Sequence, residues 1–411
     1  MIQDLAFILN IRRTIKPVFF IFSIFILSVH QSNAESRKTF NPEEFFSYDP
    51  YSKISINYEN WTSLLKATVV RARVSSREYS RRPGSGVGTR VKLSNPNPSR
   101  METSRVLFGY LKEEHIDYIH NLRLAMQSLP RTIDLQSLNR KEQLAFWLNL
   151  YNITLYEQLA KRYPITRLKR LRMGKRNKTS LWDEKILTIK GMAVSLNDIQ
   201  YKIIHKIWPD PIVLYGLYHG TIGGPNLYHK AYTGKNVYQL LELNAEEFVN
   251  SLRGLRFRGK DALTSKMYQW NHEFFPDFET DLIKHLRKYT NFELTTRLDS
   301  SRKIKASVYD WYLTDVIKGN GSTINGSVNT NPVAMILSGY GRNLPHTGKA
   351  WDTSIDNIRT QNNPKDFLKN FMIHNTKNAT KITIEEVSKE ELKKIKQKVK
   401  SEKVKDKEGL N

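Results

Sequence analysis

A glycine-rich turn carries the residues of this sequence that are best suited to chemistry. It lies in LYGLYHGTIGGPNLYHKAYTG, residues 214–234. The imidazole of His219 could serve near neutral pH as an acid, a base or a hydrogen-bond donor. The N–H groups of Gly220, Gly223 and Gly224 could point the same way and bind an anion. The turn has no Cys, Ser, Asp or Glu, so three interpretations stay open: a tight structural turn, an anion site and a catalytic centre.

Three polar residues of a predicted helix could serve the same site. Glu142, Asn149 and Asn152 lie in EQLAFWLNLYN, residues 142–152, at spacings that place them on or near one helix face. Buried carboxylates and amides require hydrogen bonds, so bonding to neighbouring loops is the structural interpretation. The functional interpretation is a hydrolase or transferase in which Glu142 or Asp198 partners His219, with Asn149 and Asn152 binding the ligand.

The residue inventory excludes several kinds of chemistry. The sequence has no cysteine, so disulfides, thiolate metal ligands and a cysteine nucleophile are all excluded. His219 and His229 are ten residues apart, and neither they nor His272 show a recognisable metal-ligand spacing. We therefore predict no metal site and no cofactor.

The N-terminus predicts export from the cytoplasm. Arg12, Arg13 and Lys16 precede a short apolar run over residues 17–29, and Ser-Asn-Ala follows at residues 32–34. This order is typical of a secretory signal peptide, with cleavage expected after Ala34. We therefore expect a secreted or periplasmic protein. The alternative is an uncleaved membrane anchor formed by residues 17–29.

The charge balance indicates anionic partners. The formal net charge is +25, and residues 61–105 hold ten Lys and Arg against Glu78 and Glu102. Glycines in this stretch lack the strand and helix of a dinucleotide-binding loop, so a basic loop is the simpler interpretation. Arg90, Arg100 and Arg105 could grip an anionic polysaccharide or a membrane surface. No motif indicates a specific nucleic-acid partner, and the sequence does not determine the oligomeric state.

The remaining patterns predict the elements that position these residues. Helical periodicity appears in residues 105–129 and 140–162, the latter capped by Asn139, and in residues 194–208, 236–252, 265–275 and 279–290. Residues 185–191 and 212–218 read as strands, residues 255–265 as a hairpin or extended pair, and the Lys-rich tail from residue 382 as an exposed helix. Together they predict an α+β fold, mostly helical, with a small mixed or antiparallel sheet.

We divide the chain into four segments. They are a signal peptide (1–34), a basic N-terminal extension (35–104), a central domain (105–316) and a Gly/Asn-rich loop region with a Lys-rich tail (317–411).

The central domain resembles a known family. EQLAFWLNLYN, VSLNDI (194–199), DPIVLYGL (210–217) and TIGGPNLYHKAYTGKNV (221–237) are similar, in this order, to blocks of the domain-of-unknown-function family 547, DUF547. The resemblance spans about residues 105–315. It implies a secreted or periplasmic bacterial protein whose α+β fold resembles thiol-protease or transglutaminase-like domains.

The sequence departs from this family where reactive residues are expected. Gly224 stands where many members have a cysteine before proline, and His219 stands where they have an earlier cysteine. The other family positions that differ are occupied by Leu214, Gln200, Tyr201 and His205. The chain thus resembles a divergent member without thiol chemistry, a pseudoenzyme.

These observations lead to one hypothesis of function and two alternatives. The first is a non-catalytic binding protein that recognises an anionic envelope component or polysaccharide through the basic stretch and the glycine turn. The second is a hydrolase or transferase with non-thiol chemistry centred on His219. The third is a structural partner in an envelope assembly.

Overall fold

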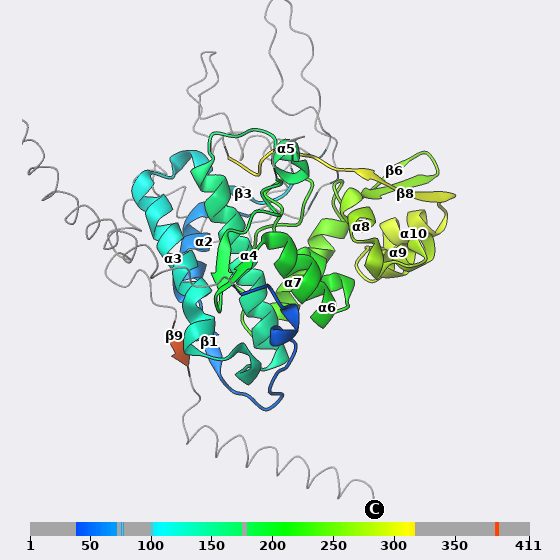
Figure 1. The fold of residues 1–411 in the computed structure, drawn as a ribbon. Coiled ribbons are helices and arrows are strands. Elements are labelled where there is room, and N and C mark those ends of the chain that lie inside the picture. Colours follow the sequence, from blue (N-terminus) through cyan, green and yellow to red (C-terminus); the bar gives the residue numbers. More distant parts are fainter. Residues whose placement is uncertain are drawn as a thin grey trace, which may run out of the picture.

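The fold is organised around one long buried helix (Figure 1). The structure, a computed structural model, describes residues 38–71, 75, 77, 99, 102–174, 179–316 and 383–385. Its helices are α2 (Glu59–Thr68), α3 (Glu113–Thr132), α4 (Arg140–Lys161), α5 (Lys169–Met173), α6 (His205–Ile207), α7 (Val237–Val249), α8 (Lys266–Trp270), α9 (Phe278–Arg287) and α10 (Phe292–Asp299). A π-helix, η5 (Asp198–Ile204), and 3-10 helices, η6 (Pro211–Gly216) and η7 (His272–Phe274), complete the part that concerns the site.

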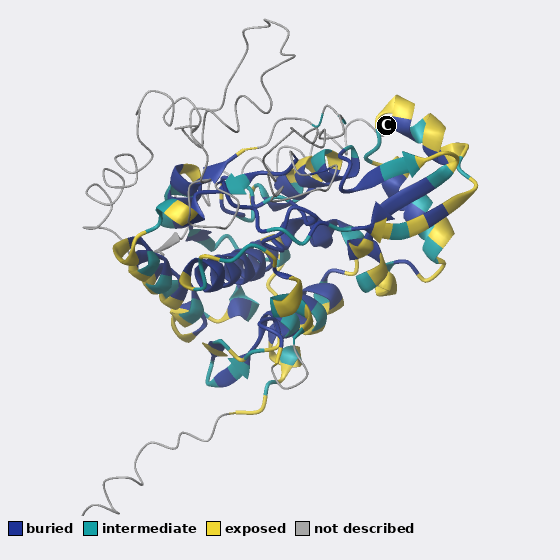
Figure 2. Cartoon of the chain, turned by 90° about the horizontal axis from the view of Figure 1, so that it is seen from above, coloured by how far each residue is buried: buried dark blue, intermediate teal, exposed yellow. Residues whose placement is uncertain are grey.

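Helix α4 forms the centre of the core. The side chain of Asn139 accepts hydrogen bonds from the N–H groups of Lys141 and Glu142, at 3.1 and 3.0 Å, and so caps the helix as predicted. Every residue from Glu142 to Ala160 is buried, because α3 packs on one side of α4 and α7 with η6 on the other (Figures 1 and 2). A helix buried all round must satisfy every polar side chain internally.

The strands form small separate sheets. Pairs are β1 (Ser55–Asn57) with β9 (Thr383–Glu385), β2 (Val69–Val70) with β3 (Arg105–Val106), and β4 (Leu187–Ile189) with β5 (Met192–Val194). The predicted hairpin is confirmed as β6 (Leu255–Arg258) and β7 (Asp261–Ser265), and β8 (Lys303–Val308) joins β7 in parallel. Many helices with one mixed three-stranded sheet confirm the predicted α+β class.

Two predicted elements do not form, and the helix predicted from residue 105 begins only at Glu113, because β3 and a 3-10 turn precede it. Residues 212–218 do not form a strand, because η6 begins at Pro211 and the Asp210 side chain caps it by accepting from the Ile212 N–H at 2.9 Å. A short buried apolar run fits either structure, and the proline with its cap decides for a helical turn. Residues 383–385 pair with β1 instead of forming the predicted exposed helix, and the rest of that tail lies outside the described residues.

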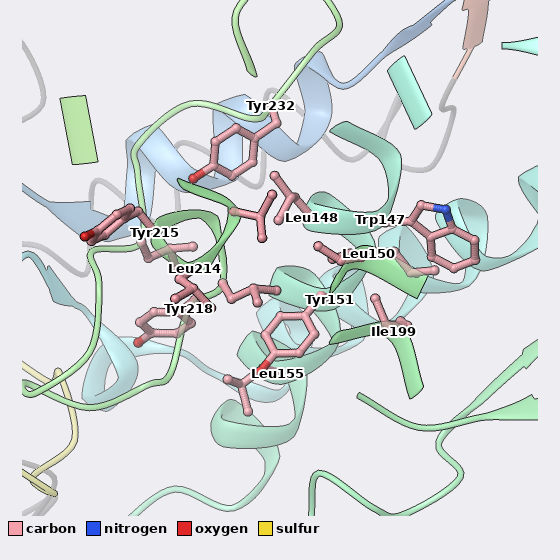
Figure 3. Close-up of a cluster of buried hydrophobic side chains, with 14 of the residues drawn as sticks. Trp147, Leu148, Leu150, Tyr151, Leu155, Ile199, Leu214, Tyr215, Tyr218 and Tyr232 are labelled. Carbon is pink, nitrogen blue, oxygen red and sulfur yellow. The ribbon is translucent and has the colours of Figure 1, made fainter. Parts of the chain in front are cut away.

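The described part of residues 38–70 packs into the same core as the central domain. Trp61 of α2 and Phe45 are about 1% exposed and contact Tyr156 and Trp147 of α4. Side chains such as Leu148 and Leu155 of α4 gather with Leu214 and Tyr218 in the middle of the molecule (Figure 3). The predicted signal segment lies outside the described residues, within which no helix is both long and apolar enough to cross a membrane.

Candidate functional site

The glycine turn lies against the chain segment that follows β8. Ile222 and Gly223 donate their N–H groups to the carbonyls of Tyr312 and Asp310, both at 2.9 Å, and Thr314 donates back to Gly220 at 3.0 Å. The same segment is also bonded to the stretch before α5: the Leu168 N–H donates to the Trp311 carbonyl at 2.9 Å. Residues 310–314 are therefore held between the turn and the stretch that leads into α5, and this segment passes beside α5 in Figure 1.

The glycines permit this close backbone packing. A Cβ atom on Gly223 would lie 2.4 Å from the Asp310 nitrogen, and one on Gly224 would lie 2.6 Å from the Cβ of His219. Gly220 has a φ of +71°, and a Cβ there would meet the Leu159 side chain at 2.5 Å. The expected anion nest is not formed, because the Gly223 and Gly224 N–H groups donate to carbonyls of the protein, Gly224 at 3.0 Å to Thr221.

His219 is buried and neutral. Its Nδ1 shares a 2.9 Å hydrogen bond with the hydroxyl of Tyr309, which also contacts the Thr221 hydroxyl at 2.7 Å. Burial, with the nearby Arg172 guanidinium, lowers the pKa of His219 to about 3. Among the described residues no carboxylate bonds to this ring. His219 therefore lacks the acidic partner that the hydrolase hypothesis requires.

Glu142 lies at the other end of α4 from His219. Its carboxylate accepts the N–H groups of Ile56 at 3.1 Å and Gly234 at 2.8 Å, and burial raises its pKa. Gly220, next to His219, abuts Leu159, and the seventeen residues from Glu142 to Leu159 correspond to about 25 Å of helix. The structure thus does not bring Glu142 and His219 together, and Glu142 instead joins β1 and the end of the turn to α4.

The two helix asparagines hold loops in place. Asn149 donates to the Tyr232 carbonyl at 2.7 Å and accepts its N–H at 3.0 Å. Asn152 donates to the Gly216 carbonyl at 2.9 Å and accepts the Tyr218 N–H at 2.9 Å. The nitrogen and the oxygen of each side-chain amide are thus hydrogen-bonded to backbone at the two ends of the turn region. This corresponds to the structural interpretation of the sequence.

The remaining predicted residues also lie outside a shared site. Asp198 is buried, but hydrogen bonds from Lys185 and Lys202 hold its pKa at about 2, and it also accepts the Ser195 N–H at 2.8 Å. It therefore anchors the start of η5. Arg105 lies in β3, opposite Val70, and Arg90 and Arg100 lie outside the described residues.

Arg172, which sequence reasoning missed, lies at the centre of a partly exposed polar cluster. Its guanidinium donates to Asn197 at 3.3 Å and to the Tyr201 hydroxyl at 3.5 Å, and it lies 4.7 Å from the centre of the Trp182 ring. No carboxylate of the described residues forms an ion pair with it. A half-buried cation with only neutral neighbours retains unmet capacity for an anion.

Three aromatic residues lie next to this cluster and are also only partly buried. The rings of Trp270 and Tyr309 are 4.6 Å apart, those of Tyr309 and Trp311 are 4.6 Å apart, and those of Trp270 and Trp311 are 5.4 Å apart. Burial raises the pKa of Tyr309, although Thr221 and Arg172 act in the opposite direction. The hydrogen bond of the Tyr309 hydroxyl with His219 links this aromatic triad to the glycine turn. In the sequence, two of these residues lie in VYDWYL, residues 308–313, where Tyr309 and Trp311 alternate with other residues.

Three residues that the sequence resemblance singled out lie at or near this cluster. Tyr201 contacts Arg172, His219 contacts Tyr309, and Gln200 donates to Asn271, next to Trp270, at 3.0 Å. The part of the chain that the structure describes shows no group of three acidic or histidine side chains placed to hold a metal. The arrangement offers a guanidinium and aromatic faces, which bind ligands. Its hydroxyl–imidazole pair, Tyr309 with His219, is buried and has no carboxylate among the described residues to orient the imidazole.

Comparison with known proteins gives one match. No curated protein and no solved structure matches the chain. Residues 135–249 match the model of a family described as "Protein of unknown function, DUF547", a shorter stretch than the sequence blocks suggested. This stretch runs from the residues before α4 to the end of α7 and includes the glycine turn, Arg172 and Tyr201. The chain therefore contains a DUF547 domain, one that has no cysteine.

Proposed function

We propose that this protein is a non-catalytic binding protein that recognises an anionic polymer of the cell envelope or its surroundings. The observation that carries the proposal is Arg172, a half-buried guanidinium whose neighbours are the neutral side chains Asn197, Tyr201 and Trp182. Because partial burial weakens the screening of its charge by water, an anion that reaches Arg172 interacts with it more strongly than with an exposed lysine.

Other buried arginines of the protein show what is missing at Arg172. Arg123 pairs with Glu157 at 2.7 Å, and Arg253 pairs with Glu247. In both cases an internal carboxylate supplies the countercharge that a buried cation needs. Arg172 has no such partner among the described residues, so we infer that an external anion supplies it.

The surroundings of Arg172 favour an extended anionic ligand. Arg167, Lys169 and Arg170 on or just before α5 are exposed, and α5 contains no acidic residue. Two carboxylates lie near this cluster: Asp183 accepts a hydrogen bond from Asn197 at 2.6 Å, and the charges of Glu273 and Asp183 both act on Tyr201. The three exposed cations outweigh these two carboxylates, and the whole chain carries a net charge of +25.

The cellular location follows from the sequence and belongs to the same proposal. A signal peptide over residues 1–34 would deliver the protein to the periplasm or the exterior, where anionic polymers of the envelope are accessible. The buried, neutral state of His219 and its separation from Glu142 support binding over catalysis.

The test is retention of the full chain on two immobilised polyanions, polygalacturonate and polyglutamate, at low and high salt. We expect binding to both that weakens with salt, and a loss of about tenfold or more on Arg172→Gln, because a hydrogen-bonded charge contact contributes about 1.5–3 kcal/mol. Arg287→Gln is the matched control, since it removes the same charge from an exposed pair with Asp299.

The outcomes separate cleanly. Failure of the unchanged protein to bind either polymer at low salt overturns the proposal. Equal losses in both variants would mean that net charge alone drives binding and that Arg172 is not the site. Thermal unfolding of both variants checks that neither result comes from misfolding.

A further inference from the structure

We propose that the aromatic triad of Trp270, Tyr309 and Trp311 is a sugar-stacking subsite, so that the ligand at Arg172 is a polymer of acidic sugars. This inference rests on the proposed function and specifies its ligand. An acidic pyranose carries its carboxylate at the edge of a ring whose faces expose C–H groups. Such a ligand needs a cation beside an aromatic surface, which is the arrangement formed by Arg172 and the triad.

The triad is rigidly placed relative to Arg172. Leu168, just before α5, donates to the Trp311 carbonyl at 2.9 Å, and the Leu313 N–H donates to the Thr166 carbonyl at 2.9 Å. Two backbone bonds in opposite directions tie residues 311–313 to the stretch that leads into α5. The Arg172 N–H donates to the Leu168 carbonyl at 2.9 Å, so Arg172 lies one helical turn from the residue that bonds Trp311.

The residues of the triad have different roles. The Tyr309 hydroxyl points inward, where it bonds His219 and Thr221, so its ring forms the base of the triad. Trp270 ends α8 and Trp311 lies in the segment after β8, and both indoles are partly exposed. Their rings are tilted by 42°, so they present two adjoining apolar surfaces rather than one closed stack.

Partial exposure of two tryptophans at this position is otherwise unfavourable for the protein. Tryptophan side chains bury large apolar areas when core space is available, as Trp61, Trp147 and Trp182 do at about 1% exposure. Exposed aromatic surface next to cationic side chains marks a ligand or partner surface. The charge of Arg172 and its exposed basic neighbours then selects an acidic sugar over a neutral one.

The test compares two polycarboxylates, polygalacturonate, which contains sugar rings, and polyglutamate, which does not. We expect Trp270→Ala to weaken binding of the full chain to polygalacturonate about three- to tenfold, as loss of one aromatic contact implies. Its binding to polyglutamate should change less than twofold, about the limit of such assays. Trp270→Phe, which keeps a ring, should recover most of the loss. Phe292→Ala removes an aromatic side chain that is 89% exposed on α10 and should change neither affinity.

The results distinguish this inference from the proposed function. Binding to both polymers with no selective effect of Trp270→Ala overturns the sugar subsite and leaves the anion site intact. Binding to neither polymer overturns both. Intrinsic fluorescence provides a second readout, since polygalacturonate should change the tryptophan emission of the unchanged protein and of Phe292→Ala, and change it less in Trp270→Ala.

Discussion

The replacement Asn152→Leu tests whether the helix asparagines act structurally or bind a ligand. Leucine has the same number of side-chain heavy atoms and the same branch point as asparagine, but it is larger and cannot form hydrogen bonds. The change leaves the Gly216 carbonyl and the Tyr218 N–H without the partners that Asn152 provides at 2.9 Å each. Both groups are buried, so water cannot replace the amide.

The expected loss of stability follows from these two groups. Leaving one buried backbone group unsatisfied costs about 1–3 kcal/mol, so the pair costs about 2–6 kcal/mol. Burial of the leucine side chain offsets part of this. We expect urea unfolding, followed by circular dichroism, to show a net loss of at least about 2 kcal/mol in the free energy of unfolding.

The control is the same substitution at an exposed position of a helix. Asn121 lies on α3 and is exposed, so Asn121→Leu should stay within about 0.5 kcal/mol of the unchanged protein. If Asn152→Leu lost less than about 1 kcal/mol while polyanion binding fell, the structural assignment would be refuted and a ligand-binding role for Asn152 would take its place.

Three further predictions concern the turn and the core. The folded-state pKa of His219, about 3, lies below the unfolded value of about 6.5, so stability should fall as pH drops through this window. His219→Gln should remove up to about 1.4 kcal/mol per pH unit of that slope in urea titrations at pH 4 to 7. Gly223→Ala should lower the free energy of unfolding by about 1–3 kcal/mol or more, because the new Cβ would meet the Asp310 backbone. In the control, Gly259→Ala, the new Cβ meets no atom, and only the strain of its φ of +59° remains. Comparable urea midpoints for the two variants would contradict this. Glu157→Gln should lower the free energy of unfolding by about 3–5 kcal/mol, because it leaves the buried Arg123 without its countercharge. A smaller loss in urea unfolding would show that water reaches the pair.

Local sequence signals predicted the elements whose causes are local. Helix α4 was found because its cap, Asn139, and its apolar periodicity both lie within the helix itself. The β6–β7 hairpin was found because strand residues flank Gly259, whose φ is positive in the structure. The η6 segment was predicted wrongly because its apolar run fits a strand and a helical turn equally well.

The candidate site could not be predicted in the same way. His219 and Gly223 suggested chemistry because their types are common in active sites, yet their partners are residues 309–310, about ninety positions later in the chain. Arg172 gave no signal, since an arginine within a basic stretch looks like a solvated surface residue. Only its contacts show that it lacks a countercharge.

The sequence by itself determined that this protein cannot use thiol chemistry, and it predicted several of the longer helices. The absence of cysteine excludes thiol chemistry in any fold, and helix caps and periodicity act between residues a few positions apart. The tertiary structure decided what each polar residue does. Whether Asn152 holds a loop, whether Gly223 meets an anion or a carbonyl, and whether Arg172 has a carboxylate beside it depend on which distant segments pack together. Burial then sets the energy of each contact, because a buried polar group without a partner is costly and an exposed one is not.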